Sequence, residues 1–537
     1  MKNKIINIPT STFLVLVGIF IFFSCKTKKE ISSDTKKNDI DANFTVNSIQ
    51  KKPNVLIIFP DQLRRYSAGF WSKEPYKSLA YGKPDPVITP NIDKLAENGV
   101  VFTNAISNFP LCSPYRGMLI SGVYPEQNGI WNNCKVERDD SLKDDIPTIT
   151  SLFKEANYNT AYVGKVHWLE NTPVFDKQGN YKGTTKPPGG EYLNKYDTYI
   201  PPNNRHGIEY FYQCVKDSHF NPFVFSNDPY TIDGKKDGEV HLPKKYTPKS
   251  ESDVIVDYLK NNRNQRDANK PFLVMWSLNP PHNPWGDQYT DMTMVNKYYN
   301  KNIYPNIDEK LVVRNNVDIE KAQHARNYFG AVTSVDFYIG KVIAQLKAMG
   351  ELDNTIIIFS SDHGEMLGSH GKQGKNQMEL ESLAIPFIVH WPKKLTPNTT
   401  DLLISVPDVL PTLMGLSGLG NSIPKSIQGK DYSSFLKGEK SNVKKPKASL
   451  LMLGNSRGVL TNRYTLVIND KKGKKSLDTS ESSYLYDNIQ DPYQLNKIAL
   501  DELSSVSKDL LNELASLLKE TNDPWYQKRK LSTIIPY

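Results

Sequence analysis

The chain has 537 residues, of which 38% are hydrophobic and 11% aromatic, and it contains no long low-complexity tract. This composition excludes a disordered or fibrous protein and favours a large globular core with a smaller appended subdomain. The formal net charge is +9, but Lys2, Lys4 and the lysine-rich segment 26–52 supply five of these charges, so the chain from Pro53 onward carries only +4. Because no recognition helix, zinc finger or aromatic RNA signature accompanies this charge, we expect no nucleic-acid partner.

The first 24 residues have the organisation of an export signal. Lys2 and Lys4 precede an unbroken run of apolar residues and glycine at 13–23, which is too short to span a bilayer, and Ser24 stands before Cys25. A small residue before cysteine resembles the bacterial lipobox. It predicts a signal peptide over 1–24, a lipidated Cys25 and a polar linker over 25–52, with the protein anchored in the bacterial cell envelope, in the periplasm or on the outer-membrane surface. The alternative is an ordinary secretory signal in which Cys25 is incidental.

Short apolar runs alternate with helical patterns from Pro53 onward. The runs at 55–59, 160–163, 272–277, 355–360 and 385–390 have the length and composition of buried strands. Helical patterns lie at 91–98 and at 324–349. The second of these repeats its apolar residues at helical spacing: Ala331, Val335, Ile339, Val342 and Leu346. Alternating strands and helices predict an α/β sandwich with a mostly parallel central sheet over 53–440.

The pattern changes after about residue 440. Residues 458–468 and 483–487 are typical of antiparallel strands, and a closing helix has its apolar residues on one face. These residues are Leu503, Val506, Leu510, Leu514 and Leu517. We therefore expect a small C-terminal α+β subdomain with an antiparallel sheet over 441–537.

Polar residues follow four of the predicted strands at the point where each strand ends. They are Asp61 and Gln62, Lys165 and His167, His282, and Asp362 and His363. A charged residue after one strand is usually a solvated loop residue. In open parallel sheets, however, ligands bind beyond the carboxyl ends of the strands, so four strands that end this way predict one shared site.

The segment 112–117 carries the most specific motif of the chain. It reads Cys112-Ser113-Pro114-Tyr115-Arg116-Gly117 and continues into an apolar, helix-like stretch. With Pro-Asn-Val-Leu-Ile-Ile-Phe-Pro-Asp at 53–61, Gly-Lys-Val-His at 164–167, Pro-Pro-His-Asn-Pro at 280–284 and Ser-Asp-His-Gly at 361–364, it resembles the type I, formylglycine-dependent sulfatases of the alkaline phosphatase superfamily. The resemblance extends from Pro53 to the C-terminus and implies an alkaline-phosphatase-like fold.

The resemblance implies that a separate formylglycine-generating enzyme oxidises Cys112. The hydrated aldehyde supplies a strong oxygen nucleophile, and its second hydroxyl allows sulfate to be expelled. Asp61, Gln62, Asp362 and His363 match the metal-binding positions of the family, and an oxygen of modified Cys112 completes them. Oxygen-rich ligation favours Ca²⁺. Gln62 and His363 stand where many relatives have aspartate and asparagine, which leaves Mg²⁺ or Mn²⁺ open.

Further basic residues match family positions. Arg116 is implied to hold the diol and the carboxylates on the metal side. Lys165 and Lys375 match the two lysines that bind the sulfate group, although Lys372 competes with Lys375 for this match. His167 is implied to orient the diol and to act as base in the elimination step, and His282 with Lys375 to stabilise or protonate the departing alcohol.

Three functions follow from these residues. The first is a sulfatase that acts on a sulfated polysaccharide or oligosaccharide. The second is a phosphodiesterase or phosphonate monoester hydrolase of the same superfamily, and the third is a surface glycan-binding protein whose Cys112 is never oxidised.

The sequence leaves open whether Cys134 and Cys214 pair. Candidate substrate contacts on loops are Arg64, Arg65, Arg205 and His206, and their spacing leaves open whether they face the cleft.

Overall fold

The computed structural model describes residues 51–528, except 136–137, 170–198, 216–218, 301, 303–316, 319 and 470–482. The predicted signal peptide over 1–24, the lipidated Cys25 and nearly all of the linker therefore lie outside the described residues. In the described part of the chain, no helix combines the length and the apolar character needed to cross a membrane.

A nine-stranded sheet in the order β5-β4-β3-β6-β1-β7-β8-β2-β9 forms the centre of the main domain. Its strands are β1 (Asn54–Ile58), β2 (Val100–Phe102), β3 (Asn159–Gly164), β4 (Tyr210–Cys214), β5 (Val224–Ser226), β6 (Phe272–Ser277), β7 (Thr355–Phe359), β8 (Ile388–His390) and β9 (Asn398–Thr400). The consecutive neighbours β4, β3, β6, β1 and β7 are all parallel. The predicted mostly parallel sheet is thus confirmed.

The run at 385–390 departs from this pattern. Only its last three residues form a strand, β8, and this strand pairs antiparallel with both β7 and β2. The run contains Pro386 and ends on His390, and its residue types carry no signal for the direction of a strand. The edge strand β5 is antiparallel to β4 as well.

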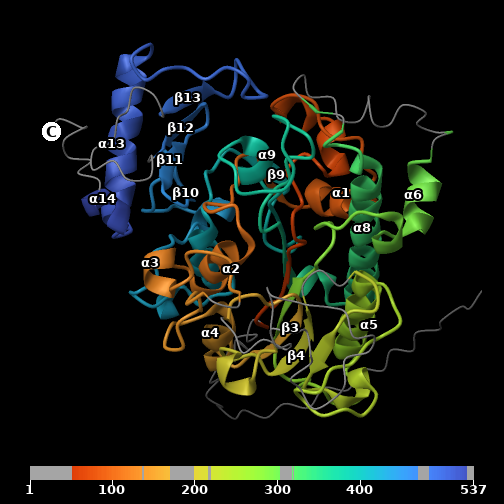
Figure 1. The fold of residues 1–537 in the computed structure, drawn as a ribbon. Coiled ribbons are helices and arrows are strands. Elements are labelled where there is room, and N and C mark those ends of the chain that lie inside the picture. The colour runs from red at the N-terminus through yellow and green to blue at the C-terminus, as the bar shows by residue number, and fades with distance from the viewer. Residues whose placement is uncertain are drawn as a thin grey trace, which may run out of the picture. The chain divides into compact units, whose positions relative to one another are not determined.

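Helices cover both faces of the sheet. The α-helices of the described residues are α1 (Pro90–Glu97), α2 (Cys112–Ser121), α3 (Pro125–Asn128), α4 (Ile149–Glu155), α5 (Thr247–Lys260), α6 (Met292–Tyr298), α8 (Ala325–Ala348), α9 (Leu380–Leu383), α10 (Val409–Leu416), α11 (Ser433–Leu436), α13 (Ser504–Glu520) and α14 (Pro524–Lys528). Along β1, Val55 and Ile57 enter one hydrophobic core while Leu56 and Ile58 enter another, because successive strand residues point to opposite faces. Side chains of α1, α5 and α8 belong to the second core, and those of α2, α4 and α10 to the first. In the view of Figure 1, α5 and α8 lie to the right of β3, and α2 and α4 lie to its left.

The long helix α8 confirms the prediction made for 324–349. All five of its predicted apolar residues are buried: Ala331, Val335, Ile339, Val342 and Leu346. It packs against α1, α5 and α6 and so closes one side of the sheet.

A second sheet of four antiparallel strands follows, as predicted. It consists of β10 (Ser449–Leu453), β11 (Ser456–Leu460), β12 (Tyr464–Ile468) and β13 (Tyr484–Asp487), in that order. Leu510, Leu514 and Leu518 of α13 are buried in the same hydrophobic core as one face of the large sheet. One set of residues of the second sheet therefore extends the main core, while Leu451, Leu460 and Val467 form a separate hydrophobic cluster with Met378, Leu380, Leu383 and neighbouring residues.

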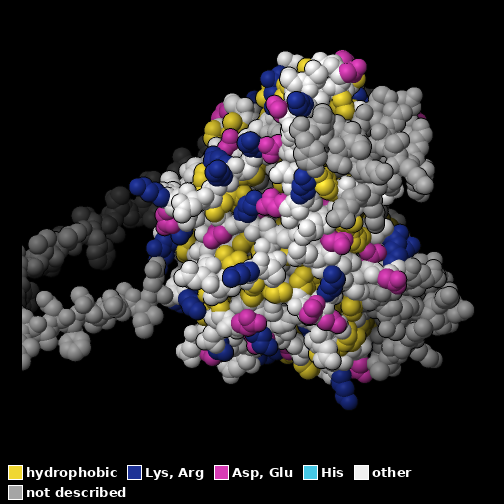
Figure 2. Space-filling model, turned by 90° about the vertical axis from the view of Figure 1, so that its left-hand side faces the viewer, with side chains coloured by type: hydrophobic (Ala, Val, Ile, Leu, Met, Phe, Trp, Pro, Cys, Tyr) yellow, Lys and Arg dark blue, Asp and Glu magenta, His cyan; other side chains and the backbone are white. Residues whose placement is uncertain are grey.

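The face that carries α13 is shown in Figure 2. Lys and Arg side chains are interspersed with Asp and Glu over its described part, and neither sign gathers into a large patch. Cys112, Cys134 and Cys214 are buried, and none of these three described cysteines forms a disulfide bond.

Glu251 of α5 provides a test of the core that is independent of any activity. Its carboxyl group is fully buried and accepts a hydrogen bond of 2.8 Å from Trp276 Nε1 on β6. Burial raises the pKa of Glu251 to about 8. Because the folded-state pKa lies above the unfolded one, the protonated group stabilises the fold at low pH, and this contribution is lost as pH rises through about 8.

We expect Glu251→Gln to flatten this pH dependence, since an amide keeps the acceptor for Trp276 and does not ionise. Wild-type protein should lose on the order of 4 kcal/mol more than the variant between pH 5 and pH 9. Thermal or urea unfolding at both pH values measures the difference. Parallel pH profiles for the two proteins would contradict the assignment.

Candidate active site

Strand register brings the first two carboxylates together. β1 and β7 are parallel neighbours in which Ile58 pairs with Phe359, so the residues three positions further on, Asp61 and Asp362, leave the sheet side by side. The backbone amide of Gln62 donates a hydrogen bond of 2.9 Å to Asp362 Oδ1, which connects the end of β1 to the end of β7. The convergence predicted from the strand ends is therefore present in the fold.

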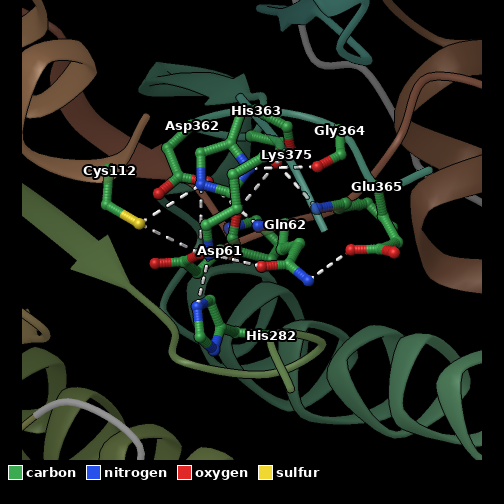
Figure 3. A network of polar contacts seen from close by, with 12 residues as sticks. Asp61, Gln62, Cys112, His282, Asp362, His363, Gly364, Glu365 and Lys375 are labelled. Atoms are coloured by element: carbon green, nitrogen blue, oxygen red, sulfur yellow. Dashed lines mark hydrogen bonds and ion pairs between the residues drawn. The ribbon is translucent and has the colours of Figure 1, made fainter. Parts of the chain in front are cut away.

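Four potential ligand groups meet at this point. Asp61, Cys112, Asp362 and His363 each offer a ligand atom, and these atoms lie within 4.8 Å of one another. All four side chains are completely buried. His363 Nε2 lies 3.2 Å from Cys112 Sγ and 3.6 Å from a carboxylate oxygen of each aspartate. Its other ring nitrogen, Nδ1, contacts the Gly364 carbonyl at 3.0 Å, so the ring is held with Nε2 facing the cluster (Figure 3).

The electrostatics of this cluster fit a divalent cation. Burial and the neighbouring charge of Asp61 raise the pKa of Asp362. Burial acts in the same direction on Asp61, but the positive charges around it, led by Lys165, outweigh burial and hold its pKa well below the usual range. Two buried carboxylates that share one small space require positive charge between them. The mixture of carboxylate oxygens with one imidazole suits such an ion.

Arg116 joins the two carboxylates from the opposite side. It lies one turn after Cys112 on α2, so both side chains lie on the same face of the helix. Arg116 Nη2 lies 3.2 Å from Asp61 Oδ2 and 3.4 Å from Asp362 Oδ2. Its Nη1 donates to the Lys165 carbonyl at 2.9 Å and to the Ser277 hydroxyl. The guanidinium thus links the ends of β1, β3, β6 and β7.

The surroundings of Cys112 favour negative charge at this position. Burial and the Asp61 carboxylate raise the pKa of the Cys112 thiol, but Lys165, Lys375 and His363 outweigh them, so that the pKa is lowered. Lys165 is itself fully buried and forms an ion pair with Asp61. Cys112 is also the first residue of α2, at the positive end of the helix dipole. An anionic nucleophile that replaces the thiol is stabilised by the same groups.

Lys375, rather than Lys372, reaches the site. Lys375 Nζ lies 2.6 Å from Gln62 Oε1 and 2.6 Å from His282 Nε2. Lys372 instead contacts Gln377 Oε1 at 2.7 Å and Glu379 Oε1 at 3.4 Å. The structure therefore favours the lysine that the resemblance singled out.

His282 is held in one orientation. Its Nδ1 contacts the Asn283 carbonyl at 2.5 Å, so this nitrogen carries the proton, and Nε2 is left to accept from Lys375. Histidine and lysine form a pair beside Gln62 (Figure 3). This pair can bind an anion and deliver a proton.

His167 is connected to the cluster less directly. Its Nε2 lies 3.0 Å from the Cys134 carbonyl, and the Cys134 amide donates to the Ser113 hydroxyl next to Cys112. The backbone of His167 has φ +58°, an unusual conformation for a residue with a side chain. His167 therefore contacts the Cys134 carbonyl, and Cys134 in turn contacts Ser113, the residue that follows Cys112.

The candidate substrate contacts on loops have structural partners instead. Arg64 forms a buried ion pair with Asp85 at 2.6 Å. Arg65 donates to the Thr103 carbonyl at 2.7 Å. In the same way, Arg205 pairs with Asp237, and His206 is largely buried, which lowers its pKa. The sequence could not show the two ion pairs, because Asp85 lies 21 residues from Arg64 and Asp237 lies 32 residues from Arg205.

Two residues of the site were not predicted from the sequence. Ser277, the last residue of β6, accepts from Arg116, and Glu365 contacts Gln62. Ser277 had a usable signal, since it ends a strand whose neighbours all contribute to the site. Glu365 lies two residues after His363, but nothing in the sequence indicates that it turns inward.

Two family profiles match the chain. The profile described as Sulfatase matches residues 53–419, and the profile described as N-sulphoglucosamine sulphohydrolase, C-terminal, matches residues 368–520. The first contains all the residues discussed above, and the second covers the antiparallel sheet and α13.

Known proteins resemble the chain along most of its length. It is 39% identical over 508 residues to an endo-4-O-sulfatase of Bacteroides thetaiotaomicron, which covers 90% of this chain and 95% of the relative. It is 28% identical over 521 residues to an ulvan-active sulfatase of Formosa agariphila, which covers 95% of this chain and 87% of the relative. A solved structure from Bacteroides thetaiotaomicron, described with the metabolism of multiple glycosaminoglycans, has a TM-score of 0.82 at 38% identity and covers 91% of this chain and 100% of its own.

Proposed function

The chain belongs to the sulfatase family, and from this premise we propose that it hydrolyses sulfate esters on a sulfated polysaccharide or oligosaccharide. One observation carries the proposal: Cys112 lies 3.2 Å from His363 Nε2 within a buried cluster of carboxylates and cations. The relatives named as acting on sulfated glycans support the substrate class, because the most similar of those described above is 39% identical over nearly its whole length.

Residue 112 supplies the nucleophile after oxidation to formylglycine, whose hydrate carries two hydroxyl groups. Lys165, Lys375 and His363 surround this position and stabilise negative charge there. Arg116 keeps Asp61 and Asp362 at a fixed separation through contacts of 3.2 and 3.4 Å. Because these groups are buried, they act without reorganisation of solvent.

Lys375 and His282 take the opposite side of the sulfate group. The lysine binds the sulfuryl oxygens, and the proton shared between Lys375 Nζ and His282 Nε2 across 2.6 Å is available to the departing alcohol. His167, held by the Cys134 carbonyl, lies on the Cys112 side, where a base is needed to release sulfate.

A divalent cation, when bound, supplies positive charge to the nucleophilic oxygen and to the sulfate. Asp61, Asp362, His363 and the Gln62 side-chain oxygen would hold it, together with an oxygen of residue 112. We propose Ca²⁺, with Mg²⁺ or Mn²⁺ as the alternatives.

Removal of divalent cations is therefore expected to lower activity by roughly 10²-fold or more, since the nucleophilic oxygen and the sulfate then lose the positive charge that the ion would supply. The measurement is turnover after dialysis against a chelator, followed by addition of each cation. Restoration by Ca²⁺ above Mg²⁺ and Mn²⁺ agrees with the assignment. Full activity in protein shown by elemental analysis to contain none of these ions contradicts it.

We also propose that the protein is exported and that Cys112 is modified during maturation. Oxidation of Cys112 requires a formylglycine-generating enzyme as partner. Cleavage after Ser24, in a segment outside the described residues, would leave Cys25 for lipidation and an anchor on the bacterial cell envelope. Mass analysis of the mature N-terminus tests this part separately.

A substrate panel tests the function. Sulfate release from 4-O-sulfated and 6-O-sulfated glycosaminoglycan oligosaccharides and from ulvan is compared with turnover of para-nitrophenyl sulfate, a phosphodiester and a phosphonate ester. The proposal predicts the highest kcat/KM on a sulfated oligosaccharide. Preference for a phosphorus ester would instead support a phosphodiesterase or phosphonate monoester hydrolase, and binding without any turnover would support a glycan-binding protein.

A further inference from the structure

Glu365 connects Gln62 to the turn that precedes Lys375. Its side chain is completely buried. One carboxylate oxygen, Oε2, accepts a hydrogen bond from Gln62 Nε2 (Figure 3). The other, Oε1, accepts from the backbone amides of Leu367 at 2.8 Å and of Gly374 at 2.7 Å. Each oxygen thus holds a different segment.

The contacts of Gln62 fix which way its amide points. An ionised carboxylate only accepts hydrogen bonds and an ammonium only donates them, so Glu365 selects the NH₂ group and Lys375 selects the carbonyl oxygen. Both neighbours impose the same orientation. The Gln62 oxygen therefore faces Lys375 and the cluster that contains Asp61 and Asp362.

The backbone of Gln62 is constrained as strongly as its side chain. Its φ of +67° lies in the left-handed region, which disfavours residues other than glycine. The amide donates to Asp362 Oδ1 at 2.9 Å, and the carbonyl accepts from the Tyr328 hydroxyl at 2.9 Å. A strained residue persists where its surroundings determine it completely, and such residues concentrate at functional sites.

The second oxygen of Glu365 shapes the loop that carries Lys375. The Met366 amide donates to the Gly374 carbonyl at 2.8 Å, and the Gly368 amide donates to the Lys372 carbonyl at 2.8 Å, so residues 366–374 fold back on themselves. Glu365 Oε1 lies inside this turn and holds both of its ends. Lys375 is the next residue, and its position depends on the turn.

We propose that Glu365 is a positioning residue that presents the Gln62 oxygen to the cation and Lys375 to the sulfate group. It has no described contact with the reacting atoms or with Asp61, Cys112, Asp362 and His363, and it acts through Gln62 and the 366–374 turn. This inference rests on the proposed function for the roles of Lys375 and Gln62, but the orientation of the Gln62 amide can be tested without turnover.

Glu365→Gln is the test variant. Its amide oxygen can still accept from Leu367 and Gly374, but its NH₂ group then faces the NH₂ group of Gln62. We expect the Gln62 amide to rotate away, the cation Kd to rise and kcat/KM to fall, each by about 10–100-fold. The melting temperature of the cation-free protein should stay within a few degrees of wild type, because the turn keeps its acceptor.

The double variant Gln62→Glu with Glu365→Gln restores the hydrogen bond between residues 62 and 365, with donor and acceptor exchanged. The new glutamine donates to the new glutamate, whose second oxygen still faces Lys375. We expect cation affinity and kcat/KM to recover by about tenfold relative to the single variant. Glu379→Gln is the matched control: Glu379 is another nearly buried glutamate of this segment, but it pairs with Lys372 and should change neither quantity.

Calorimetric titration with Ca²⁺ gives the decisive comparison. Wild-type affinity in Glu365→Gln, or equal losses in the single and the double variant, would overturn the positioning role. If wild-type protein with a verified aldehyde at position 112 released no sulfate from any substrate, the proposed function would fail. The difference in cation affinity between the variants would still decide the role of Glu365.

Discussion

Replacing Cys112 by alanine is expected to lower sulfate-ester turnover by roughly 10³-fold or more, because alanine cannot be converted to the aldehyde that supplies the nucleophile. The fold should remain intact. Cys112 is fully buried but small, so loss of its sulfur costs about 1 kcal/mol and leaves the α2 backbone in place. Initial rates and a thermal unfolding curve on the same preparation measure both effects.

Cys134→Ala is the matched control for this variant. Cys134 is equally buried, and its hydrogen bonds to Ser113 and His167 use backbone atoms that alanine retains. We expect it to keep turnover within about threefold of wild type, a change below 1 kcal/mol. Retention of normal activity by Cys112→Ala would rule out residue 112 as the nucleophile.

Arg116→Lys is expected to produce the second large loss, on the order of 10²-fold or more in kcat/KM. One ammonium cannot replace a guanidinium that contacts Asp61, Asp362, Lys165 and Ser277 at once. The two carboxylates would then sit at a different separation, so cation affinity should fall together with turnover. The free energy of unfolding should also fall, by about 3–5 kcal/mol if the buried carboxylates lose their partner.

The control for Arg116→Lys separates activity from stability. Arg457 is also buried and pairs with Asp523 at 2.7 Å, but this pair joins β11 to the segment after α13 and lies outside the proposed site. Arg457→Lys should destabilise the protein without changing kcat for the folded enzyme. Equal effects of both substitutions on kcat at a temperature where both variants are folded would contradict a specific role for Arg116.

The parts of the fold that could be predicted are those with a local signal. The apolar run of β1 followed by Asp61, and that of β7 followed by Asp362, identified both the strands and their convergence, because the ends of parallel strands lie on one edge of a sheet. The helical spacing of the apolar residues in α8 was likewise sufficient to predict this helix. The antiparallel direction of β8 could not be predicted, because its residues Ile388, Val389 and His390 carry no signal for strand direction.

The parts that could not be predicted depend on partners distant in the sequence. Arg64 and Arg205 have the sequence surroundings of loop residues. Only the structure shows that Arg64 pairs with Asp85 and that Arg205 pairs with Asp237. The choice of Lys375 over Lys372 is made by a turn whose centre, Glu365, is hydrogen-bonded to backbone amides. Hydrogen bonds from backbone amides to a carboxylate cannot be predicted from residue type, because any carboxylate could accept them.

The most direct test of the whole account is mass spectrometry of the peptide that contains residue 112, taken from protein produced in its native host. We predict an aldehyde at this position that reacts with a hydrazide reagent, and that the fraction modified equals the fraction of active enzyme. A preparation that hydrolyses sulfate esters while every copy of Cys112 remains an unmodified thiol would contradict the account.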